Sequence, residues 1–359
     1  MKTATLTLTV ACLVAVLQTG ALATEAAADH GLRTTDYYLS HESREPFYRQ
    51  NNLPPDVVLH VREVVAAGNE RTAGKNNKVL FFIHGATFPA SVAFDLDHEN
   101  ASMMRHFAGL GWDTFALDLE GYGESTRPPI MDQPESYPDN KAPIDLAVTV
   151  DDVGRAVDFI RNLRGVDKVH ILGWSAASMA EAPRYTIQQP DKVAKLVLYA
   201  TNYLGKSKGK TAAERQAEDD KHNAEKNRYG DPANMKRWAK LGTKEEYLIP
   251  GAFEAYRQAH LASDPKSTEL GGKVRAPWGR FIGWPEPHFD ASKITVPTMV
   301  IRGDSATLGS REDNQNLIAD LGSKEKKYVE IAVACHMIQY EKSNATFYQA
   351  IAEFLDGGK

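Results

Sequence analysis

The 359-residue chain can bury one large core, because 42% of its residues are hydrophobic and 25% are charged, a composition typical of globular proteins. This composition excludes a disordered or fibrous protein. The formal net charge of -5 is too small to attract nucleic acid, acidic membranes or a basic partner by charge alone.

The first residues have the pattern of a secretory signal. Lys2 precedes an apolar run from Ala4 to Leu17, and the small residues Ala21-Leu22-Ala23 follow it, as they do before a signal-peptidase site. We therefore expect residues 1–23 to be removed, with maturation near Thr24. The product would be secreted or periplasmic, without stable membrane insertion. Because the run is short for a membrane span, an uncleaved anchor is only the alternative.

Strand-like and helix-like segments then alternate, as a parallel sheet flanked by helices requires. The predicted strands in the first half are Val57–Val65, Lys78–Ile83, Thr114–Leu117 and Lys168–Leu172, and the predicted helices are Asn100–Leu110 and Ala147–Leu163. This alternation predicts an α/β fold with a mostly parallel sheet.

Two loops that follow predicted strands have notable residues. The second strand runs directly into His84-Gly85-Ala86, where the glycine allows a sharp bend. The loop after Thr114–Leu117 contains Gly121 and Gly123, which would provide tight turns. Glu120 and Glu124 lie in the same loop and have the residue types of a general acid and base; we interpret them instead as loop or surface carboxylates.

The most informative stretch is Gly173-Trp174-Ser175-Ala176-Ala177, which joins a β-branched apolar run to a helix-like segment. A nucleophile elbow has this arrangement: a sharp turn between strand and helix holds a serine hydroxyl clear of the backbone, and small neighbours prevent collisions. The usual pattern ends in glycine, where this chain has Ala177. Ser175 is the candidate nucleophile; the alternative is an ordinary helix N-cap.

After the predicted strand Lys195–Tyr199, the alternation is interrupted over residues 203–290. This insertion begins with a lysine- and glycine-rich segment, continues through a charged stretch, and becomes richer in aromatic residues. Its aromatic side chains could line a substrate pocket or form the core of the insertion itself, and we favour the second role for most of them; they are Trp238, Tyr247, Phe253, Tyr256, Trp278, Phe281 and Trp284.

Two further strands lead to candidate catalytic residues. Thr298–Arg302 ends at Gly303-Asp304, and Tyr328–Ala332 leads to Cys335-His336, before a predicted helix over Asn344–Leu355. The alternative for Asp304 is a surface-turn aspartate. Glu312 and Asp313 are farther along the chain and are typical of the first turn of a helix.

Removal of the signal would leave Cys335 as the only cysteine, so we expect no internal disulfide. We interpret Cys335 as a packing residue, because a residue next to His336 in sequence points elsewhere at a strand end. His84 is interpreted as structural, holding its loop by hydrogen bonds. No short-spaced cluster of histidine, cysteine or carboxylate residues indicates a metal site.

The chain order Ser175, Asp304, His336, with each residue after a predicted strand, resembles that of the α/β-hydrolase superfamily. The resemblance extends from about Val57 to the C-terminus and implies an α/β-hydrolase core over residues 24–202 and 291–359. It also implies that the insertion over residues 203–290 forms a helical cap above the catalytic face.

The resemblance assigns a chemical role to each candidate. His336 would take the proton of the Ser175 hydroxyl, and Asp304 would orient His336. The backbone N–H groups of Ala176 and Ala86 would stabilise the negative oxygen formed on the attacked carbonyl. In many relatives the acid lies about three residues after the strand-ending glycine, where this chain has Ala306, so Asp304 is the carboxylate close to that place.

These roles predict an exported serine hydrolase that cleaves a small-molecule carboxylic ester through an acyl-enzyme, without a cofactor. Lactone opening and acyl transfer would use the same residues. A serine rather than an aspartate at residue 175 argues against haloalkane dehalogenases and epoxide hydrolases, and a peptidase has no positive signal. A noncatalytic ligand-binding protein of the same fold is the alternative from another class. The sequence points to no particular oligomeric state.

Overall fold

The computed structural model describes residues 15–17, 21–25, 31–72, 74–133, 143–203, 211, 213–214, 217, 229–277 and 289–357. The strands are β1 (Ala15–Leu17), β2 (Ala21–Glu25), β3 (Leu32–Glu42), β4 (Asp56–Ala66), β5 (Val79–Ile83), β6 (Asp113–Asp118), β7 (Val169–Trp174), β8 (Val193–Tyr199), β9 (Tyr229–Gly230), β10 (Val274–Arg275), β11 (Thr298–Gly303) and β12 (Lys326–Ile331). The α-helices are α1 (Glu45–Gln50), α2 (Ala90–Phe94), α3 (Met103–Gly109), α4 (Leu146–Arg164), α5 (Ala176–Met179), α6 (Glu181–Gln188), α8 (Met235–Lys240), α9 (Ala252–Ala262), α10 (Arg311–Asp320) and α11 (Asn344–Leu355). Short 3-10 helices include η5 (Glu245–Tyr247) and η7 (Ile338–Tyr340).

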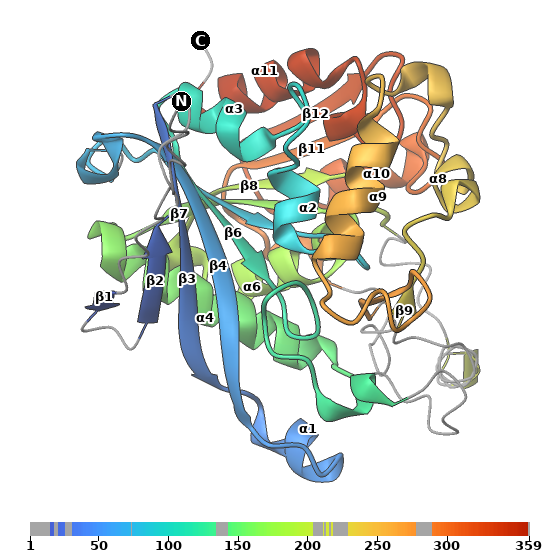
Figure 1. Cartoon of the computed structure of the whole chain (residues 1–359). Helices are drawn as coiled ribbons and strands as arrows, with labels where there is room; N and C mark the ends of the chain where they lie inside the picture. The colour runs from blue at the N-terminus through green and yellow to red at the C-terminus, as the bar shows by residue number, and fades with distance from the viewer. Residues whose placement is uncertain are drawn as a thin grey trace, which may run out of the picture.

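One twisted sheet organises the described part of the chain (Figure 1), in the order β1-β2-β3-β4-β6-β5-β7-β8-β11-β12. Strands β6, β5, β7, β8, β11 and β12 are parallel, whereas β1 to β4 join them in antiparallel pairs. Parallel strands end at the same edge of a sheet, so the loops after β5, β7, β11 and β12 meet there. The sequence places its candidate catalytic residues in these four loops.

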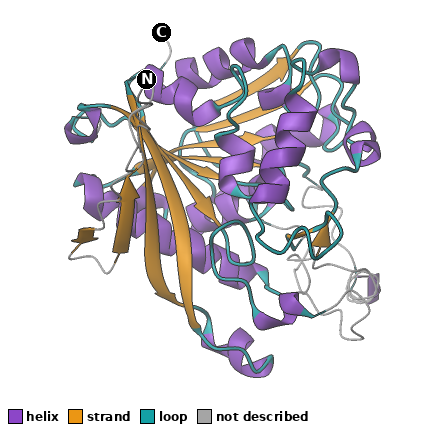
Figure 2. Ribbon diagram, in the orientation of Figure 1, coloured by secondary structure: helices purple, strands orange, loops and turns teal. Residues whose placement is uncertain are grey.

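Helices cover both faces of the sheet, as Figure 2 shows. Helices α4, α6 and α10 pack on one face, and α3 and α11 pack on the other. The side chains of β5 are fully buried on both faces, because Leu80 and Phe82 join one core cluster while Phe81 and Ile83 join the other. The continuous apolar runs in the sequence therefore correspond to central parallel strands with both faces covered.

The predicted fold class is confirmed, and the predicted elements correspond to β4, β5, α3, β6, α4, β7, β8, β11, β12 and α11. The sequence analysis missed β3, which pairs with β4 along its whole length. It also did not predict β1 and β2. Strand β2 spans the expected cleavage point near Thr24, so these edge strands consist mostly of residues that signal processing would remove.

The described part of the insertion contains α8, η5 and α9 between two short strands, β9 and β10, which pair with each other. It packs against the segment that follows His336: the backbone N–H of Ile249 donates to the carbonyl of Tyr340 at 2.9 Å. The indole of Trp238 stacks on the Tyr340 ring, with centroids 5.7 Å apart and planes 10° apart. The insertion and the histidine loop are thus packed as one unit.

Within the ranges that the structure describes, none of the helices combines the length and the apolar character needed to cross a bilayer.

Candidate active site

The turn between β7 and α5 has the geometry of a nucleophile elbow. Ser175 has φ 53° and ψ -117°, a strained conformation that a non-glycine residue rarely adopts outside functional turns. The loop that contains Gly85 packs closely against this turn. A side chain at residue 85 would collide with Ser175, because its Cβ would lie 2.9 Å from the Ser175 Cβ. Ala177 fits the last position of the motif with its methyl group fully buried, so the departure from glycine leaves the turn intact.

The loop after β12 brings His336 to this serine. The Nε2 atom of His336 lies 2.9 Å from the Ser175 Oγ, within hydrogen-bond distance. His336 is only 1% exposed. Its burial, together with the positive charge of Arg237, lowers the pKa of His336 to about 3. The imidazole is therefore neutral at pH 7 and can accept the serine proton.

The backbone around His336 is held by three side chains whose contacts with it the sequence analysis did not predict. The hydroxyl of Tyr199 and the indole N–H of Trp174 donate to the His336 carbonyl, at 2.8 and 3.3 Å. On the other side, the buried carboxylate of Glu341 accepts the backbone N–H of Cys335 at 2.8 Å. Burial raises the pKa of Glu341 to about 7. No local motif predicts these contacts, because only the folded chain brings the three side chains to the histidine loop.

The structure does not bring Asp304 to the His336 ring, which differs from the predicted triad. The exposed Asp304 carboxylate accepts the backbone N–H groups of Val333 and Ala334, at 3.1 and 3.3 Å. Val333 has φ 55°, so these bonds stabilise a strained turn just before the histidine. The His336 Nδ1 is buried and has no hydrogen-bond partner among the described residues. Asp304 therefore supports the backbone of the histidine loop and not its ring.

The two residues predicted to supply an oxyanion hole lie close to Ser175. Ala86 and Ala176 line the same cavity as Ser175 and His336. Ala176 is the first residue of α5, where a helix leaves its N–H groups free. Neither N–H is hydrogen-bonded to an acceptor in the described chain. The structure thus places the predicted oxyanion residues beside the predicted nucleophile.

The catalytic cavity, as we call this space, has a volume of about 280 Å³. Most of its wall is apolar, and the complete lining consists of Ala86, Phe88, Trp174, Ser175, Ala176, Met179, Arg237, Leu241, Leu308, His336 and Met337. The insertion contributes Arg237 and Leu241. Because ligand pockets commonly range upward from about 300 Å³, this cavity suits a small substrate.

Most aromatic residues of the described insertion form its core and do not line the cavity. Trp238 and Tyr256 are buried, with ring centroids 4.6 Å apart, and Phe253 packs against Trp238. This arrangement confirms the core interpretation for these three. Tyr247 is half-buried and accepts a hydrogen bond from Lys244 at 3.2 Å. The predictions for Trp278, Phe281 and Trp284 lie outside the described residues.

Two other histidines shape the loops beside the site. The Nε2 of His84 accepts the backbone N–H of Leu119 at 3.1 Å, and its Nδ1 lies 2.7 Å from the Gly85 carbonyl. These bonds agree with the structural role predicted for His84. His60 lies between two carboxylates, with Nδ1 2.7 Å from Asp118 and Nε2 2.8 Å from Asp36.

The loop after β6 corrects one interpretation. Glu124 is exposed as predicted, but Glu120 is fully buried next to Asp152, whose carboxylate accepts the Glu120 backbone N–H at 3.0 Å. Burial raises the pKa of Glu120 to about 7, and burial and the neighbouring Glu120 raise that of Asp152. Gly121 and Gly123 have φ 86° and 49°, so they form the tight turns that the sequence predicts.

One group of possible metal ligands is present in the described chain, although the sequence indicated none. Single ligand atoms of His41, Glu120 and Asp152 lie within 4.8 Å of one another. The acids are buried and their raised pKa values favour a shared proton over two negative charges. These three residues could hold a divalent cation only by releasing that proton.

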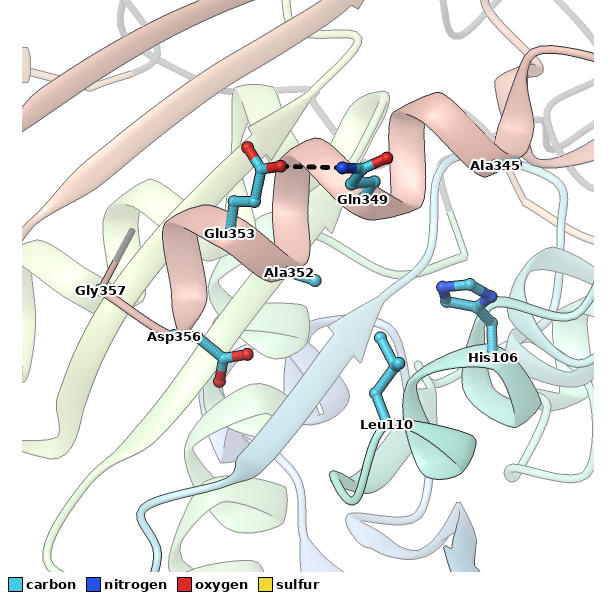
Figure 3. Close-up of a pocket in the computed structure, with 8 residues that line it drawn as sticks. All are labelled: His106, Leu110, Ala345, Gln349, Ala352, Glu353, Asp356 and Gly357. Atoms are coloured by element: carbon cyan, nitrogen blue, oxygen red, sulfur yellow. Dashed lines mark hydrogen bonds between the residues drawn. The ribbon is translucent and has the colours of Figure 1, made fainter. Parts of the chain in front are cut away.

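A larger hollow, of about 770 Å³, lies away from Ser175, between α3 and α11. Figure 3 shows His106 on α3 and Leu110 at its end facing Ala352 on α11, while the Glu353 side chain points away from them. The hydrogen bond within this group joins Gln349 to Glu353 along α11 at 3.0 Å. The lining of this hollow contains no nucleophile next to a base, so the catalytic cavity is the better candidate for an active site.

Cys335 does not take part in the chemistry. Its thiol is buried and lies 2.6 Å from the Gly242 carbonyl. Burial raises the pKa of the thiol to about 12, so it is unreactive at neutral pH. The predicted packing role is confirmed.

Comparisons with known proteins agree with this geometry. No curated protein sequence matches the chain. Among solved structures, a thermophilic esterase from Thermogutta terrifontis superposes with a TM-score of 0.57 at 15% identity, covering 89% of this chain and 98% of the esterase. The enol-lactonase from Burkholderia xenovorans gives a TM-score of 0.55 at 15% identity, covering 83% of this chain and 96% of the lactonase.

A probable hydrolytic enzyme from Pseudomonas aeruginosa gives a TM-score of 0.57 at 14% identity, covering 89% of this chain and 94% of that enzyme. Identities this low show the fold alone. The sequence profile of the alpha/beta hydrolase fold family matches residues 78–343. This range contains the elbow at Ser175, the His84-Gly85-Ala86 loop and the loop that bears His336. The chain therefore belongs to the α/β-hydrolase fold family.

Proposed function

We propose that this protein is a serine hydrolase that cleaves carboxylic esters of small molecules through an acyl-enzyme. The observation that carries the proposal is the 2.9 Å separation between the Ser175 Oγ and the His336 Nε2 at a strained elbow. A binding site has no need for a hydroxyl held in strain against a neutral buried imidazole.

The reaction follows from the positions of these groups. The Ser175 Oγ attacks the ester carbonyl carbon while its proton passes to the His336 Nε2. The carbonyl oxygen becomes negative and accepts hydrogen bonds from the N–H groups of Ala86 and Ala176. His336 then returns the proton to the leaving alcohol oxygen, which leaves an acyl group on Ser175. Water, deprotonated by His336, releases the acid by the same steps.

In this proposal Asp304 is a positioning residue. It holds the turn at Val333 and Ala334 that presents His336 to Ser175. The Ser175–His336 pair then carries the proton transfers, with Glu341 supporting the loop from its buried side. Lactone opening and acyl transfer use the same groups, and differ in whether the alcohol stays attached and whether water reaches the acyl-enzyme.

The apolar lining and the small volume of the catalytic cavity support a compact ester in preference to a long acyl chain. We also propose that the enzyme is exported, because an apolar run and small residues precede Thr24. N-terminal sequencing of the protein secreted by its host cells tests this point. Processing near Thr24 is the expected result, and an intact N-terminus would support the anchor.

Reaction of the purified protein with a fluorophosphonate probe tests the serine hydrolase directly. One added probe mass is expected for the parent protein, with no addition for Ser175→Ala. Ser91→Ala, which alters a half-buried serine on α2, is the matched control and should be labelled like the parent. A folded parent protein that takes up no probe would favour the noncatalytic binding protein.

A further inference from the structure

Arg237 introduces a positive charge into an otherwise apolar catalytic cavity. It lies on α8 of the insertion and lines the same cavity as Ser175 and His336. Its side chain is half-buried, and burial lowers the pKa of its guanidinium below the usual range. A guanidinium in such a place has lost part of its hydration, which an anionic partner would replace.

No carboxylate of the described chain pairs with Arg237, in contrast to three other buried or half-buried arginines. Arg62 donates to Asp36 at 2.9 Å, and Arg302 donates to Glu330 at 2.5 Å. Arg275 donates to Asp264 at 2.6 Å. The charge neighbours that act on Arg237 are the hydroxyls of Tyr256 and Tyr122. Arg127 and Arg155 also lack a carboxylate partner in the described chain, but they donate to backbone carbonyls. The Arg237 side chain has neither kind of partner among the described residues.

The charge of Arg237 is felt by the base of the proposed reaction. After burial, it is the group that lowers the pKa of His336. It also contributes to lowering the pKa of His260, a buried histidine on α9. A negative group bound to Arg237 would offset this repulsion and make His336 a stronger base at the moment when substrate is present.

From these observations we infer that the substrate is a small ester or lactone that also has a carboxylate, and that Arg237 binds this carboxylate inside the catalytic cavity. The inference rests on the proposed function and names its substrate class. The planar guanidinium fork of arginine matches the two oxygens of a carboxylate. The cavity volume of about 280 Å³ limits the substrate to a short molecule, such as the half-ester of a short dicarboxylic acid.

The surface outside the cavity has the same sign of charge. Arg237 also borders a second hollow of about 440 Å³, together with Asn234, Lys236 and Lys240. These side chains all belong to α8 or its N-cap. The lysines of this hollow add positive charge near Arg237, which favours the capture of an anionic ester over that of a neutral ester.

The test compares two esters of nearly the same shape. Monomethyl succinate has a carboxylate where methyl isocaproate has an isopropyl group, and the release of methanol measures both reactions. The parent enzyme should favour the acidic ester in kcat/KM by about 10- to 100-fold, the range expected for a charged hydrogen bond. Arg237→Gln should abolish most of this preference, mainly through a higher KM, and Arg237→Lys should restore part of it.

Arg257→Gln is the matched control. Arg257 is an arginine of α9 whose guanidinium pairs with Glu254 at 2.6 Å, and it does not line the cavity. It should keep the preference of the parent. Equal rates for the two esters in the parent enzyme, or an equal loss on both esters in Arg237→Gln, would overturn the inference.

Calorimetry with a protein that cannot turn over separates this inference from the proposed function. Monomethyl succinate should bind to Ser175→Ala, and the affinity should fall at least about tenfold in Ser175→Ala/Arg237→Gln. Fluorophosphonate labelling of the parent without any such binding would overturn the carboxylate inference while the hydrolase stands. Binding without labelling or turnover would instead overturn the hydrolase and retain Arg237 as an anion site.

Discussion

His60 and His336 are both 1% exposed, yet their surroundings have opposite effects on the imidazole. Burial disfavours the charge of His60, but hydrogen bonds with Asp118 and Asp36 outweigh it and raise the pKa of His60 to about 10. His336 has Ser175 on one nitrogen and, among the described residues, no partner on the other. Its pKa is lowered to about 3 by burial and by Arg237.

The difference shows how this fold keeps one buried histidine charged and leaves the other neutral, as the proposed base. The imidazolium of His60 joins β4 to β3 and to the end of β6, through two carboxylates that stay ionised. A base must stay neutral until it takes a proton, so His336 faces a hydroxyl and a cation instead. Because both imidazoles are equally buried, their neighbouring groups account for the difference between them.

Separate substitution of the two histidines by glutamine should give the largest contrast, with one variant losing activity and the other losing stability. His336→Gln should lower kcat/KM for ester hydrolysis by at least about 10³-fold, because the serine loses its base, while thermal stability stays close to that of the parent. His60→Gln should lower the free energy of unfolding by about 3–5 kcal/mol, because it leaves the buried carboxylate of Asp118 without its cationic partner, whereas Asp36 keeps Arg62. Rates per folded molecule, with urea unfolding curves, measure both. Comparable losses of stability in the two variants would contradict the assignment.

Asp304→Asn tests whether His336 works without a carboxylate on its ring. We expect kcat to fall by no more than about tenfold, whereas the loss of an aspartate that orients the imidazole lowers it by about 10⁴-fold. Asp313→Asn, which removes the acid of the capping box on α10, is the control for a nearby structural acid. A loss of about 10³-fold or more at unchanged stability would mean that the Asp304 carboxylate reaches His336 in the reacting enzyme.

The pH dependence of kcat/KM reports the same difference in solution. Because the pKa of His336 is about 3, the base stays neutral from pH 7 to pH 5 and activity should hold over this range. Arg237→Gln should move the acid limb to higher pH, because the guanidinium charge helps to lower that pKa. Initial rates after a rapid pH jump measure the limb without unfolding. An acid limb near the ordinary histidine pKa of about 6.5 would show a carboxylate paired with His336.

Local sequence pattern was sufficient for the elements in the centre of the sheet and for the residues at their ends. Apolar runs such as Val79–Ile83 are strands because both of their faces are covered, and Ser175 was recognisable from small residues around a strand-to-helix turn. Strand β3 was missed because polar residues such as Asp36 interrupt its pattern. Only the pairing of Asp36 with His60 and Arg62 on β4 explains them.

The site was predictable where backbone geometry decides and unpredictable where the direction of a side chain decides. Ala86 and Ala176, for which we propose an oxyanion role through their backbone N–H groups, line the cavity as the turns of the sequence predicted. The position of Asp304 in sequence could not show that its carboxylate faces the N–H groups of Val333 and Ala334. Arg237 belongs to no motif, and the role that we propose for it depends on its lack of a carboxylate partner among the described residues.

The smallest predicted effect concerns Glu120 and Asp152, two buried carboxyl groups that have no ionised base within hydrogen-bond distance in the described chain. Burial raises the folded-state pKa of Glu120 from 4.5 to about 7, so the folded protein binds a proton that the unfolded chain releases above pH 4.5. The contribution of this group to stability is therefore complete below pH 4.5. It decreases as the pH rises toward 7, by at most about 1.4 kcal/mol per pH unit.

Glu120→Gln should remove this decrease. The melting temperature of the variant, relative to that of the parent at the same pH, should therefore be higher at pH 8 than at pH 5. Glu124→Gln, an exposed glutamate of the same loop, should leave the profile unchanged. Zinc or manganese chloride and a chelator complete the experiment, because His41, Glu120 and Asp152 have metal-ligating atoms within 4.8 Å of one another. If the pair shares a proton, these additions should leave the melting temperature of the parent unchanged. If the metal stabilises the parent but not Glu120→Gln, the partner of these acids is a cation. That cation would then pair with them as His60 pairs with Asp118.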